Sequence, residues 1–384
     1  MENSQYIMNT YSRFPVVLDH GQGARVWDGQ GKAYLDFVAG IAVNSLGHNH
    51  PRLVSAIAAQ AAKMIHVSNL YYTQPQMDLA ERLVKLSGLG KAFFCNSGAE
   101  AIEGSLKLSR KYAVKQGSGR FEVVAMENSF HGRTFGALTA TGQLKYQKGY
   151  APLLPGFKHI PFNDIAALRA AVDHKTCAVL VEPVQGEGGV RPADKAFLQA
   201  ARELCDQNGC LLIFDEVQCG AGRTGTFFAF EQFGVRPDVA ALAKGLAGGV
   251  PIGCVLATEE AASAFQPGDH ASTFGGNPLA TAAANAVVEV ITGGLLENVT
   301  ANGAYLTQGL KALRAKHPVI REVRGLGFLQ GIELDTPVAE VIDRCIGKGL
   351  LLVNAGTSVI RFVPPLIVGR AEIDEALAIL DEAL

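Results

Sequence analysis

The sequence predicts an α/β fold in which a mostly parallel sheet is covered by helices on both faces. Short apolar runs bounded by Gly, Pro or Asp alternate with segments of helical composition through the middle of the chain. The apolar runs occupy residues 92–95, 122–126, 177–181, 211–214 and 239–243, and the helical segments include residues 99–115 and 195–207. Ligands of such sheets bind at the carboxyl ends of the strands, so we expect the functional site there.

The two ends of the chain have a different pattern, which predicts a second domain. Short alternating segments at residues 24–28 and 33–37 suggest a small antiparallel meander. From about Pro278, a long alanine-rich helix leads into a β/α mixture, with strands expected near residues 322–324, 328–333, 350–353 and 359–363. We therefore expect a large ligand-binding domain at residues 48–285 and a smaller α+β domain formed by residues 1–47 and 286–384.

The composition is that of a globular protein with more than one core, because 48% of the 384 residues are hydrophobic and 18% are charged. A net charge of −2, without a long basic run, argues against nucleic acid or an anionic membrane as the main partner. Neither a signal peptide nor a membrane span is evident, so we expect a cytoplasmic protein whose ligand is a small molecule.

The seven cysteines are odd in number and scattered along the chain, and none lies in a CxxC pair. This pattern favours neither a disulfide framework nor a zinc site. We expect reduced, mostly buried thiols and no bound metal.

Two side chains at predicted strand ends carry the most chemical information. Asp215 ends one apolar run, and Lys244 ends another and is followed by glycines. A carboxylate in this position can keep a pyridinium nitrogen protonated, while a neighbouring lysine can form an imine with an aldehyde on the same ring. Pyridoxal 5′-phosphate (PLP) chemistry needs both groups. Taken singly, however, Asp215 could cap a helix and Lys244 could reach solvent.

A candidate phosphate site follows the first central strand. Ser97 and Gly98 form an expected turn before a helix, where free backbone amides and a hydroxyl can cradle an anion. An ordinary serine cap of the helix remains the alternative. A hydroxyl- and glycine-rich loop at residues 272–278 could also close on a phosphate, although, taken alone, it is better explained as a plain loop before a helix.

The segment at residues 130–134 offers an aromatic ring, a glycine and an arginine after a predicted strand. Phe130 could stack on a cofactor ring, and Arg133 could grip a substrate carboxylate. A core phenylalanine and a surface arginine are an equally weighted alternative. His131 fits a structural role or a contact at the ring edge better than the role of a catalytic base.

Together these segments resemble the class III (ornithine-type) PLP-dependent aminotransferases, and among them most closely the acetylornithine aminotransferases. The resemblance spans nearly the whole chain. It is carried by YLDF at residues 34–37, GIAV at 40–43, LGH at 46–48, FCNSGAEA at 94–101, FHGRT at 130–134, EPVQGEGG at 182–189, DEVQ at 215–218, GRTG at 222–225 and AKGL at 243–246. It implies the PLP fold type I architecture, with a large domain and a smaller α+β domain.

The resemblance assigns cofactor contacts to specific residues. It implies that Lys244 is the Schiff-base lysine and that Asp215 pairs with the pyridine nitrogen. The further implied contacts are Phe130 stacked on the ring, Val217 and Gln218 beside it with Gln218 at its 3-oxygen, Ser97, Gly98 and Ala99 around the phosphate, and Thr273 reaching the phosphate from the neighbouring subunit. The last contact would make a homodimer obligatory. Many relatives have Thr in place of Ala99, so we expect a backbone amide contact there.

The resemblance also implies how two substrates share one site. Arg361 would grip the α-carboxylate of glutamate or 2-oxoglutarate, and Glu187 would cover Arg361 when the other substrate binds. Arg133, with Ser272 adjacent, would grip the α-carboxylate of N-acetylornithine. Bidentate arginine–carboxylate geometry suits this task better than a lysine. Glu187 and Arg361 could instead form a static ion pair, but alternation between substrates favours a switchable one.

The resulting expectation is a cytoplasmic, homodimeric transaminase of arginine biosynthesis. It would convert N2-acetylornithine and 2-oxoglutarate to N-acetylglutamate semialdehyde and glutamate, with ping-pong kinetics. Related donors remain alternatives: ornithine, succinylornithine, N-succinyl-diaminopimelate and 4-aminobutyrate. A PLP aminomutase or decarboxylase of the same fold fits less well, because it has no need for both Glu187 and Arg361. A binding protein on an inactive scaffold would have lost Asp215 or Lys244.

Overall fold

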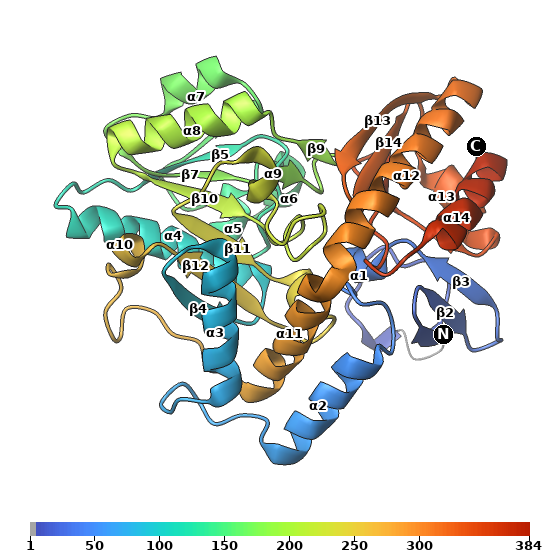
Figure 1. The fold of residues 1–384 in the computed structure, drawn as a ribbon. Coiled ribbons are helices and arrows are strands. Elements are labelled where there is room, and N and C mark those ends of the chain that lie inside the picture. Colours follow the sequence, from blue (N-terminus) through green and yellow to red (C-terminus); the bar gives the residue numbers. More distant parts are fainter. Residues whose placement is uncertain (1–4) are drawn as a thin grey trace.

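A computed structural model describes residues 5–384 of the protein. Its centre is a seven-stranded sheet in the order β4-β12-β11-β10-β7-β5-β6 (Figure 1). The strands are β4 (Lys91–Cys95), β5 (Glu122–Met126), β6 (Phe157–Ile160), β7 (Thr176–Val181), β10 (Leu211–Asp215), β11 (Val239–Leu242) and β12 (Gly253–Ala257). All are parallel except β12, which runs antiparallel to both of its neighbours. The predicted mostly parallel sheet is therefore confirmed.

Helices cover both faces of this sheet because successive strand residues point to opposite sides. Phe214 packs in the core shared with α3 (Gln74–Ser87) and α8 (Lys195–Asn208), whereas Ile213 packs in the core shared with α4 (Gly98–Lys115). All five residues of β10 are buried, which explains why this strand appears in the sequence as a continuous apolar run. The predicted two-sided cover is thus confirmed.

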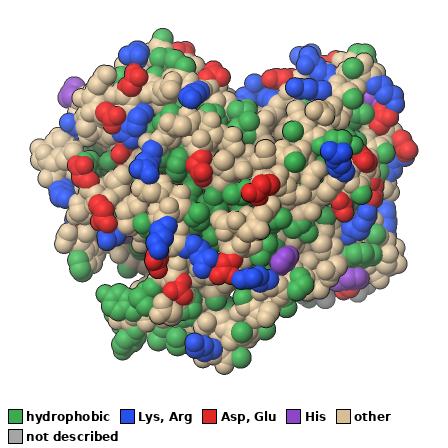
Figure 2. Space-filling model, viewed as in Figure 1, with side chains coloured by type: hydrophobic (Ala, Val, Ile, Leu, Met, Phe, Trp, Pro, Cys, Tyr) green, Lys and Arg blue, Asp and Glu red, His purple; other side chains and the backbone are tan. Residues whose placement is uncertain are grey.

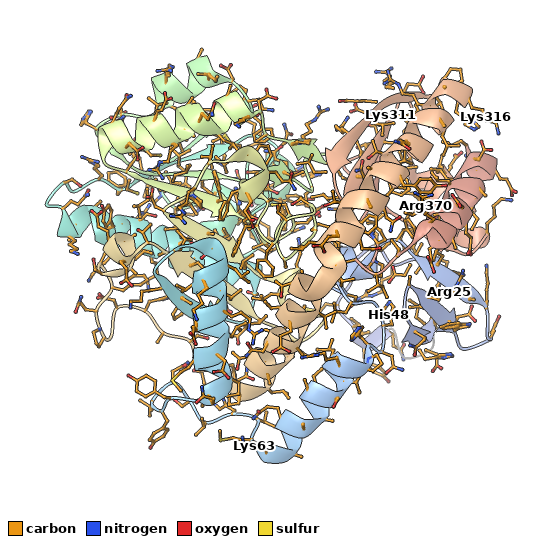
Figure 3. All side chains as sticks on the ribbon, in the orientation of Figure 1. Arg25, His48, Lys63, Lys311, Lys316 and Arg370 are labelled. Atoms are coloured by element: carbon orange, nitrogen blue, oxygen red, sulfur yellow. The ribbon has the colours of Figure 1, made fainter. Side chains whose placement is uncertain are left out.

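Of the two four-stranded sheets, the first combines segments from both ends of the chain and the second is formed by its C-terminal part. One has the order β1-β2-β3-β15 and another the order β13-β14-β17-β16. Their strands are β1 (Leu18–Gln22), β2 (Arg25–Asp28), β3 (Ala33–Asp36), β13 (Ile320–Leu326), β14 (Leu329–Leu334), β15 (Leu350–Leu351), β16 (Val353–Ala355) and β17 (Val359–Phe362). Arg25, labelled in Figure 3, forms an ion pair with Glu375 on helix α14 (Arg370–Ala383), which ties β2 to the C-terminal helix.

Two details differ from the sequence-based expectation. The apolar run at residues 350–353 is split into β15 and β16, which belong to different sheets. Strands β6 and β12 were not among the expected ones. The domain boundaries at residues 47/48 and 285/286 remain a prediction, and residues 1–4 of the expected small domain lie outside the described part of the chain.

A long helical segment connects the large sheet with the C-terminal elements (Figure 1). It consists of α11 (Pro278–Val290), a π-helical turn η3 (Ile291–Leu295) with Gly294 at φ 133°, and α12 (Leu296–Lys316). By length and composition alone, Pro278–Lys316 could cross a membrane. However, α11 packs against α2 (Pro51–Lys63) and α3, and α12 packs against α14 and β13, as expected of a helix in the core of a globular protein.

The remaining elements are short and mostly connect or cover the larger ones. They are α1 (Ala39–Ala42), α5 (Phe135–Ala140), α6 (Leu144–Gln147), α7 (Ile165–Ala171), β8 (Val184–Gln185), β9 (Arg191–Pro192), α9 (Phe230–Phe233), η2 (Lys244–Leu246), α10 (Glu259–Ala262) and α13 (Ala339–Gly347). All seven cysteines are buried and free, as the sequence predicts. Among residues 5–384, no cluster of His, Cys, Asp and Glu side chains is arranged to hold a metal ion.

Candidate active site

A cavity of about 430 Å³ lies at the carboxyl ends of the parallel strands. Asp215 is the last residue of β10, and Lys244 follows β11, the next strand in the sheet. The cavity brings together most of the residues that the sequence singles out: Ser97, Gly98, Ala99, Phe130, Arg133, Asp215, Val217, Gln218 and Lys244. The location agrees with the rule that such sheets bind ligands at their carboxyl edge.

Asp215 is held in place by two hydrogen bonds. Its Oδ2 lies 2.7 Å from Nδ1 of His131, and its Oδ1 accepts the backbone N–H of Val217 at 3.0 Å. Asp215 and His131 are both buried. Within the described part of the chain, Nε2 of His131 has no hydrogen-bond partner. His131 therefore orients the Asp215 carboxylate, which agrees with the structural role expected for it.

The start of α4 forms an amide-lined turn at the same cavity. Ser97 caps the helix, because its side chain accepts the backbone N–H of Glu100 at 3.2 Å, and Glu100 in turn accepts the backbone N–H of Asn96. A Cβ atom on Gly98 would lie 2.7 Å from the side chain of Val217. The ordinary cap and a phosphate cradle are compatible, since the first amides of a helix remain free to bind an anion.

Lys244 adopts a left-handed backbone conformation with φ 43°, which is strained for a residue with a side chain. Burial lowers the pKa of its amine; the Arg361 guanidinium also lowers it, whereas the Glu187 carboxylate opposes this shift. A lowered pKa increases the fraction of neutral amine near neutral pH. The neutral amine is the form that reacts with an aldehyde.

Arg361 and Glu187 form an ion pair whose charges act on Lys244, although neither residue lines the cavity itself. Nη1 of Arg361 donates to Oε1 of Glu187 at 2.5 Å and to Oε1 of Gln218 at 2.8 Å. Burial alone would raise the pKa of Glu187, but the charge and hydrogen bond of Arg361 outweigh burial and hold this pKa below its usual value. Within residues 5–384, Nε of Arg361 has no hydrogen-bond partner. The guanidinium therefore keeps a free donor for a second carboxylate.

Arg133 lies in a different part of the site. Its side chain is exposed, with the guanidinium carbon 5.5 Å from the ring centre of Phe130 and 4.2 Å from that of Tyr146. Cation–π contacts of this kind orient a guanidinium and leave its N–H donors free. Arg133 and Arg361 thus provide two separate places where a carboxylate can bind.

Ser272 and Thr273 do not line the cavity that contains Lys244. Asn96, which does line it, donates from its side chain to Oγ of Ser272 at 3.1 Å. Thr273 lines a neighbouring groove with Ser272 and several residues of the loop between α2 and α3. Thr273 therefore lies outside the cavity of its own chain. The resemblance predicts that it contacts the phosphate bound in the neighbouring subunit.

Glu182 is a further residue of the site. It begins the EPVQGEGG motif, but the sequence alone assigns it no role. It lines the cavity, and its carboxylate accepts the backbone N–H groups of Phe130 at 2.9 Å and Gly186 at 3.2 Å. Burial raises its pKa above the usual value, and the nearby Asp215 carboxylate adds to this effect. The signal for it was present, because Glu182 directly follows β7 just as Asp215 ends β10.

The donor set at this cavity fits PLP. The cofactor needs an amine for its aldehyde, a carboxylate for its ring nitrogen and hydrogen-bond donors for its phosphate. Lys244, the oriented Asp215 carboxylate and the amides that follow Ser97 supply these three groups around one cavity. The apolar side chains of Val217 and Phe130 can enclose a flat ring between them.

Comparison with known proteins identifies the family. The family model described as "Aminotransferase class-III" matches residues 6–384. The chain belongs to the class-III aminotransferases. Members of this family are PLP-dependent transaminases, so the predicted family, cofactor and enzyme class are confirmed.

Similar class-III aminotransferases are known from bacteria and archaea. The chain is 56% identical to the acetylornithine aminotransferase of Caldanaerobacter subterraneus, covering 99% of this chain and 97% of that protein. It is 53% identical to the acetylornithine aminotransferase of Methanocaldococcus jannaschii, covering 98% of this chain and 96% of that protein.

Solved structures of this family superpose on the chain over nearly its full length. The N-acetylornithine aminotransferase of Stenotrophomonas maltophilia has a TM-score of 0.86 at 42% identity, covering 99% of this chain and 97% of the other. The ornithine aminotransferase of Toxoplasma gondii has a TM-score of 0.95 at 34% identity, covering 99% and 92%. The predicted PLP fold type I architecture is thereby confirmed.

Proposed function

We propose that the protein is an N2-acetylornithine:2-oxoglutarate aminotransferase of arginine biosynthesis. The single observation that carries this proposal is the Glu187–Arg361 pair, whose charges act on Lys244, with Arg133 held separately by Phe130 and Tyr146. One site then offers two arginines to the carboxylates of two differently shaped substrates: Arg361, which is paired with Glu187, and Arg133, whose contacts are with aromatic rings. The acetylornithine aminotransferases at about half or more sequence identity over the whole chain support the same substrate.

In the proposed site, each residue has one of three roles: it binds the cofactor, orients another group, or accepts a proton. Ser97, Gly98 and Ala99 would hold the phosphate of PLP, Phe130 and Val217 would enclose its ring, and Gln218 would contact the ring's 3-oxygen. Asp215, oriented by His131, holds the proton of the ring nitrogen. When bound, PLP supplies the aldehyde that exchanges amines and the electron sink that makes the substrate proton acidic. Nζ of Lys244 accepts that proton.

Substrate alternation follows from the two arginines. When N-acetylornithine binds, Arg133 grips its α-carboxylate with Ser272 nearby, and Glu187 stays paired with Arg361. When 2-oxoglutarate or glutamate binds, its α-carboxylate replaces Glu187 at Arg361. Exchange of one carboxylate for another keeps the buried guanidinium paired in both states, which avoids the cost of an isolated buried charge.

The test of this function is a spectroscopic and kinetic comparison of amino donors. N-acetylornithine is expected to abolish the visible absorption band of the bound cofactor, 2-oxoglutarate is expected to restore it, and Lys244→Ala should show neither response. Ornithine is the second candidate donor, since the ornithine aminotransferase of T. gondii shares the fold. Succinylornithine, N-succinyl-diaminopimelate and 4-aminobutyrate complete the series, and an aminomutase would show no dependence on 2-oxoglutarate. Equal or better turnover of 4-aminobutyrate would defeat the assignment.

A homodimer with shared active sites is the second part of the proposal. Thr273 lies outside its own chain's cavity, which suits a contact with the phosphate bound by a second copy. Hydrophobic side chains also gather at the lower left of Figure 2, where the loop between α2 and α3 protrudes. Leu70 and Tyr72 of this loop are 83% and 90% exposed, and Phe274, whose ring centre lies 5.4 Å from that of His66 in the same loop, is 61% exposed. Large exposed apolar patches commonly mark protein–protein contacts.

The proposed location is the cytoplasm. Seven buried free thiols suit a reducing compartment. Both proposed substrates are small, charged metabolites, and neither nucleic acid nor a membrane is required for the reaction.

A further inference from the structure

Arg223 is a buried arginine for which the proposed mechanism has no use. It belongs to the GRTG motif in the loop that connects β10 to α9, and its residue is 2% exposed. Among residues 5–384 it forms no salt bridge, although the charge of the Asp36 carboxylate favours its charged form, and its Nη2 has no hydrogen-bond partner. A buried guanidinium that is not in direct contact with a carboxylate is costly, so packing alone does not explain why the side chain is charged.

The guanidinium of Arg223 bridges the two strands that carry and support Arg361. Its Nη1 donates to the carbonyl oxygen of Phe328 at 3.3 Å and to the carbonyl oxygen of Pro364. Phe328 directly precedes β14, and Pro364 lies just after β17, three residues beyond Arg361. Strands β14 and β17 are antiparallel neighbours, so one side chain clamps their adjacent ends.

Backbone contacts hold the same junction rigidly. The carbonyl oxygen of Arg223 accepts the backbone N–H of Phe328 at 2.9 Å. Gly327 has φ +54°, and a Cβ atom on it would lie 2.7 Å from that carbonyl oxygen. The junction therefore tolerates little displacement of the loop relative to the start of β14.

The loop that contains Arg223 is itself anchored at the cofactor site. Glu216, next to Asp215, accepts the backbone N–H groups of Ala229 at 2.7 Å and Phe230 at 2.8 Å, which closes the base of the loop. Gln218 in the same loop accepts a hydrogen bond from Arg361 at 2.8 Å. The loop thus contacts the β17 segment twice, once at the guanidinium of Arg361 and once at the backbone that follows it.

We propose that Arg223 is a positioning residue that fixes the β17 segment so that Arg361 meets the α-carboxylate of the 2-oxo acid. The inference rests on the proposed role of Arg361 in binding 2-oxoglutarate and glutamate. Loss of the clamp displaces Arg361 without touching Arg133, so the two half-reactions respond unequally. The half-reaction with the dicarboxylic substrate is impaired, and the half-reaction with N-acetylornithine is largely preserved.

The test measures both half-reactions in the PLP-loaded enzyme with Arg223→Met, Arg223→Gln and Arg223→Lys. Misplacement of a binding group by about 1 Å can cost about 100-fold, so we expect the KM for 2-oxoglutarate to rise about tenfold or more in Arg223→Met. The KM for N-acetylornithine should change by less than about twofold. Arg223→Lys retains the positive charge and one donor nitrogen, and it should give an intermediate value. An equal loss in both half-reactions, or no loss in either, would overturn the proposal.

Two controls separate this result from other causes. Arg202→Met removes a partly buried arginine that binds Asp238, away from β14 and β17, and should lower thermal stability without splitting the two KM values. Arg361→Lys tests the proposed function itself: an unchanged KM for 2-oxoglutarate in this variant would refute the role of Arg361, whatever Arg223 does. If all three Arg223 variants fail to fold, Arg223 is a folding determinant and the proposal is wrong.

Discussion

At the residue scale, the chemistry depends on how neighbouring charges tune Lys244. Burial lowers the pKa of its amine, the negative charge of Glu187 raises this pKa, and the positive charge of Arg361 lowers it further. The two charges act in opposite directions, so the Glu187–Arg361 pair leaves the effect of burial dominant. Separation of that pair during the proposed substrate exchange would then change the electrostatic field at Lys244 as well as the binding of a carboxylate.

The first prediction concerns the pKa of Lys244. Glu187→Gln removes a negative charge that favours the ammonium form, so the pKa of Lys244 should fall further below its usual value. The pH dependence of covalent cofactor attachment to the apoprotein measures this, and its midpoint should move to lower pH. Glu203→Gln, an exposed carboxylate on α8, is the matched control and should leave the midpoint unchanged. A midpoint that moves upward would contradict the electrostatic explanation.

The second prediction concerns the support of Asp215. His131→Ala removes the ring nitrogen that lies 2.7 Å from Oδ2 of Asp215. Loss of one hydrogen bond to a charged group costs about 1.5–3 kcal/mol, which corresponds to a loss of cofactor affinity of roughly tenfold to 100-fold if Asp215 holds the ring nitrogen. Equilibrium dialysis of PLP measures this affinity. His174→Ala, at an exposed position, should bind normally. Unchanged PLP affinity in His131→Ala would show that the contact between His131 and Asp215 does not support cofactor binding.

At the element scale, the sequence predicts the positions of the strands better than it predicts which strands pair with each other. The five expected central strands are present because each is a buried apolar run that ends at a turn signal. Strand β12 was missed although all five of its residues are buried, as are those of β10. Its antiparallel direction nevertheless follows from chain length, because about ten residues separate it from β11 and a parallel crossover needs a dozen or more.

The site shows the same division between what sequence can and cannot reveal. The sequence predicts Asp215 and Lys244 as site residues because they follow apolar strands, and it predicts Ser97 because a strand–turn–helix pattern surrounds it. The pairs that give these residues their properties are distant in sequence: Arg361 and Gln218 are 143 residues apart, and Asp215 and His131 are 84 apart. No local pattern encodes such pairs, because they depend on how elements pack. The family resemblance supplied the Glu187–Arg361 pair, which residue types alone did not.

The third prediction concerns the close contact between Gly47 and Gly23, which lies in the turn between β1 and β2. Gly47 has φ +72°, and a Cβ atom there would lie 2.5 Å from the carbonyl oxygen of Gly23. Gly47→Ala should therefore lower the free energy of unfolding by about 1–3 kcal/mol. Gly29→Ala is the matched control, because nothing lies within 4 Å of its Cβ position, and it should change stability by less than about 0.5 kcal/mol. Thermal or urea denaturation compares the two, and equal stability would show that the turn relaxes.

At the scale of the whole molecule, the site is assembled from segments that lie far apart in the chain. Lys244 and Asp215 belong to the seven-stranded sheet, whereas Arg361 lies on β17 of a separate sheet formed by the C-terminal part of the chain. The clamp at Arg223 connects these two parts. Thr273, in contrast, lies in a groove beside the exposed apolar loop at residues 68–72, so one chain leaves the proposed phosphate contact incomplete. A second copy supplies it in the proposed dimer.

The last prediction tests whether active sites are shared between subunits. Lys244→Ala removes the amine of its own site, and Thr273→Asp places a negative charge where the proposed contact with a phosphate occurs. Each variant alone should be inactive or nearly so. If Thr273 serves the partner's site, a heterodimer of the two variants contains one site with an intact Lys244 and an intact Thr273. Random reassociation of equal amounts should then restore about a quarter of the wild-type activity, since half the dimers are mixed and each has one working site.

The matched control places both substitutions in one chain and mixes it with wild type. With shared sites, each site of the mixed dimer carries one of the two substitutions, so the mixed dimers are inactive and only the wild-type homodimers contribute. With sites confined to single chains, the mixed dimer retains one working site, and the two separate variants cannot complement each other. The two arrangements therefore predict opposite results in the two mixtures. Complementation by the separate variants, together with its absence in the control, is the outcome that the position of Thr273 outside its own cavity predicts.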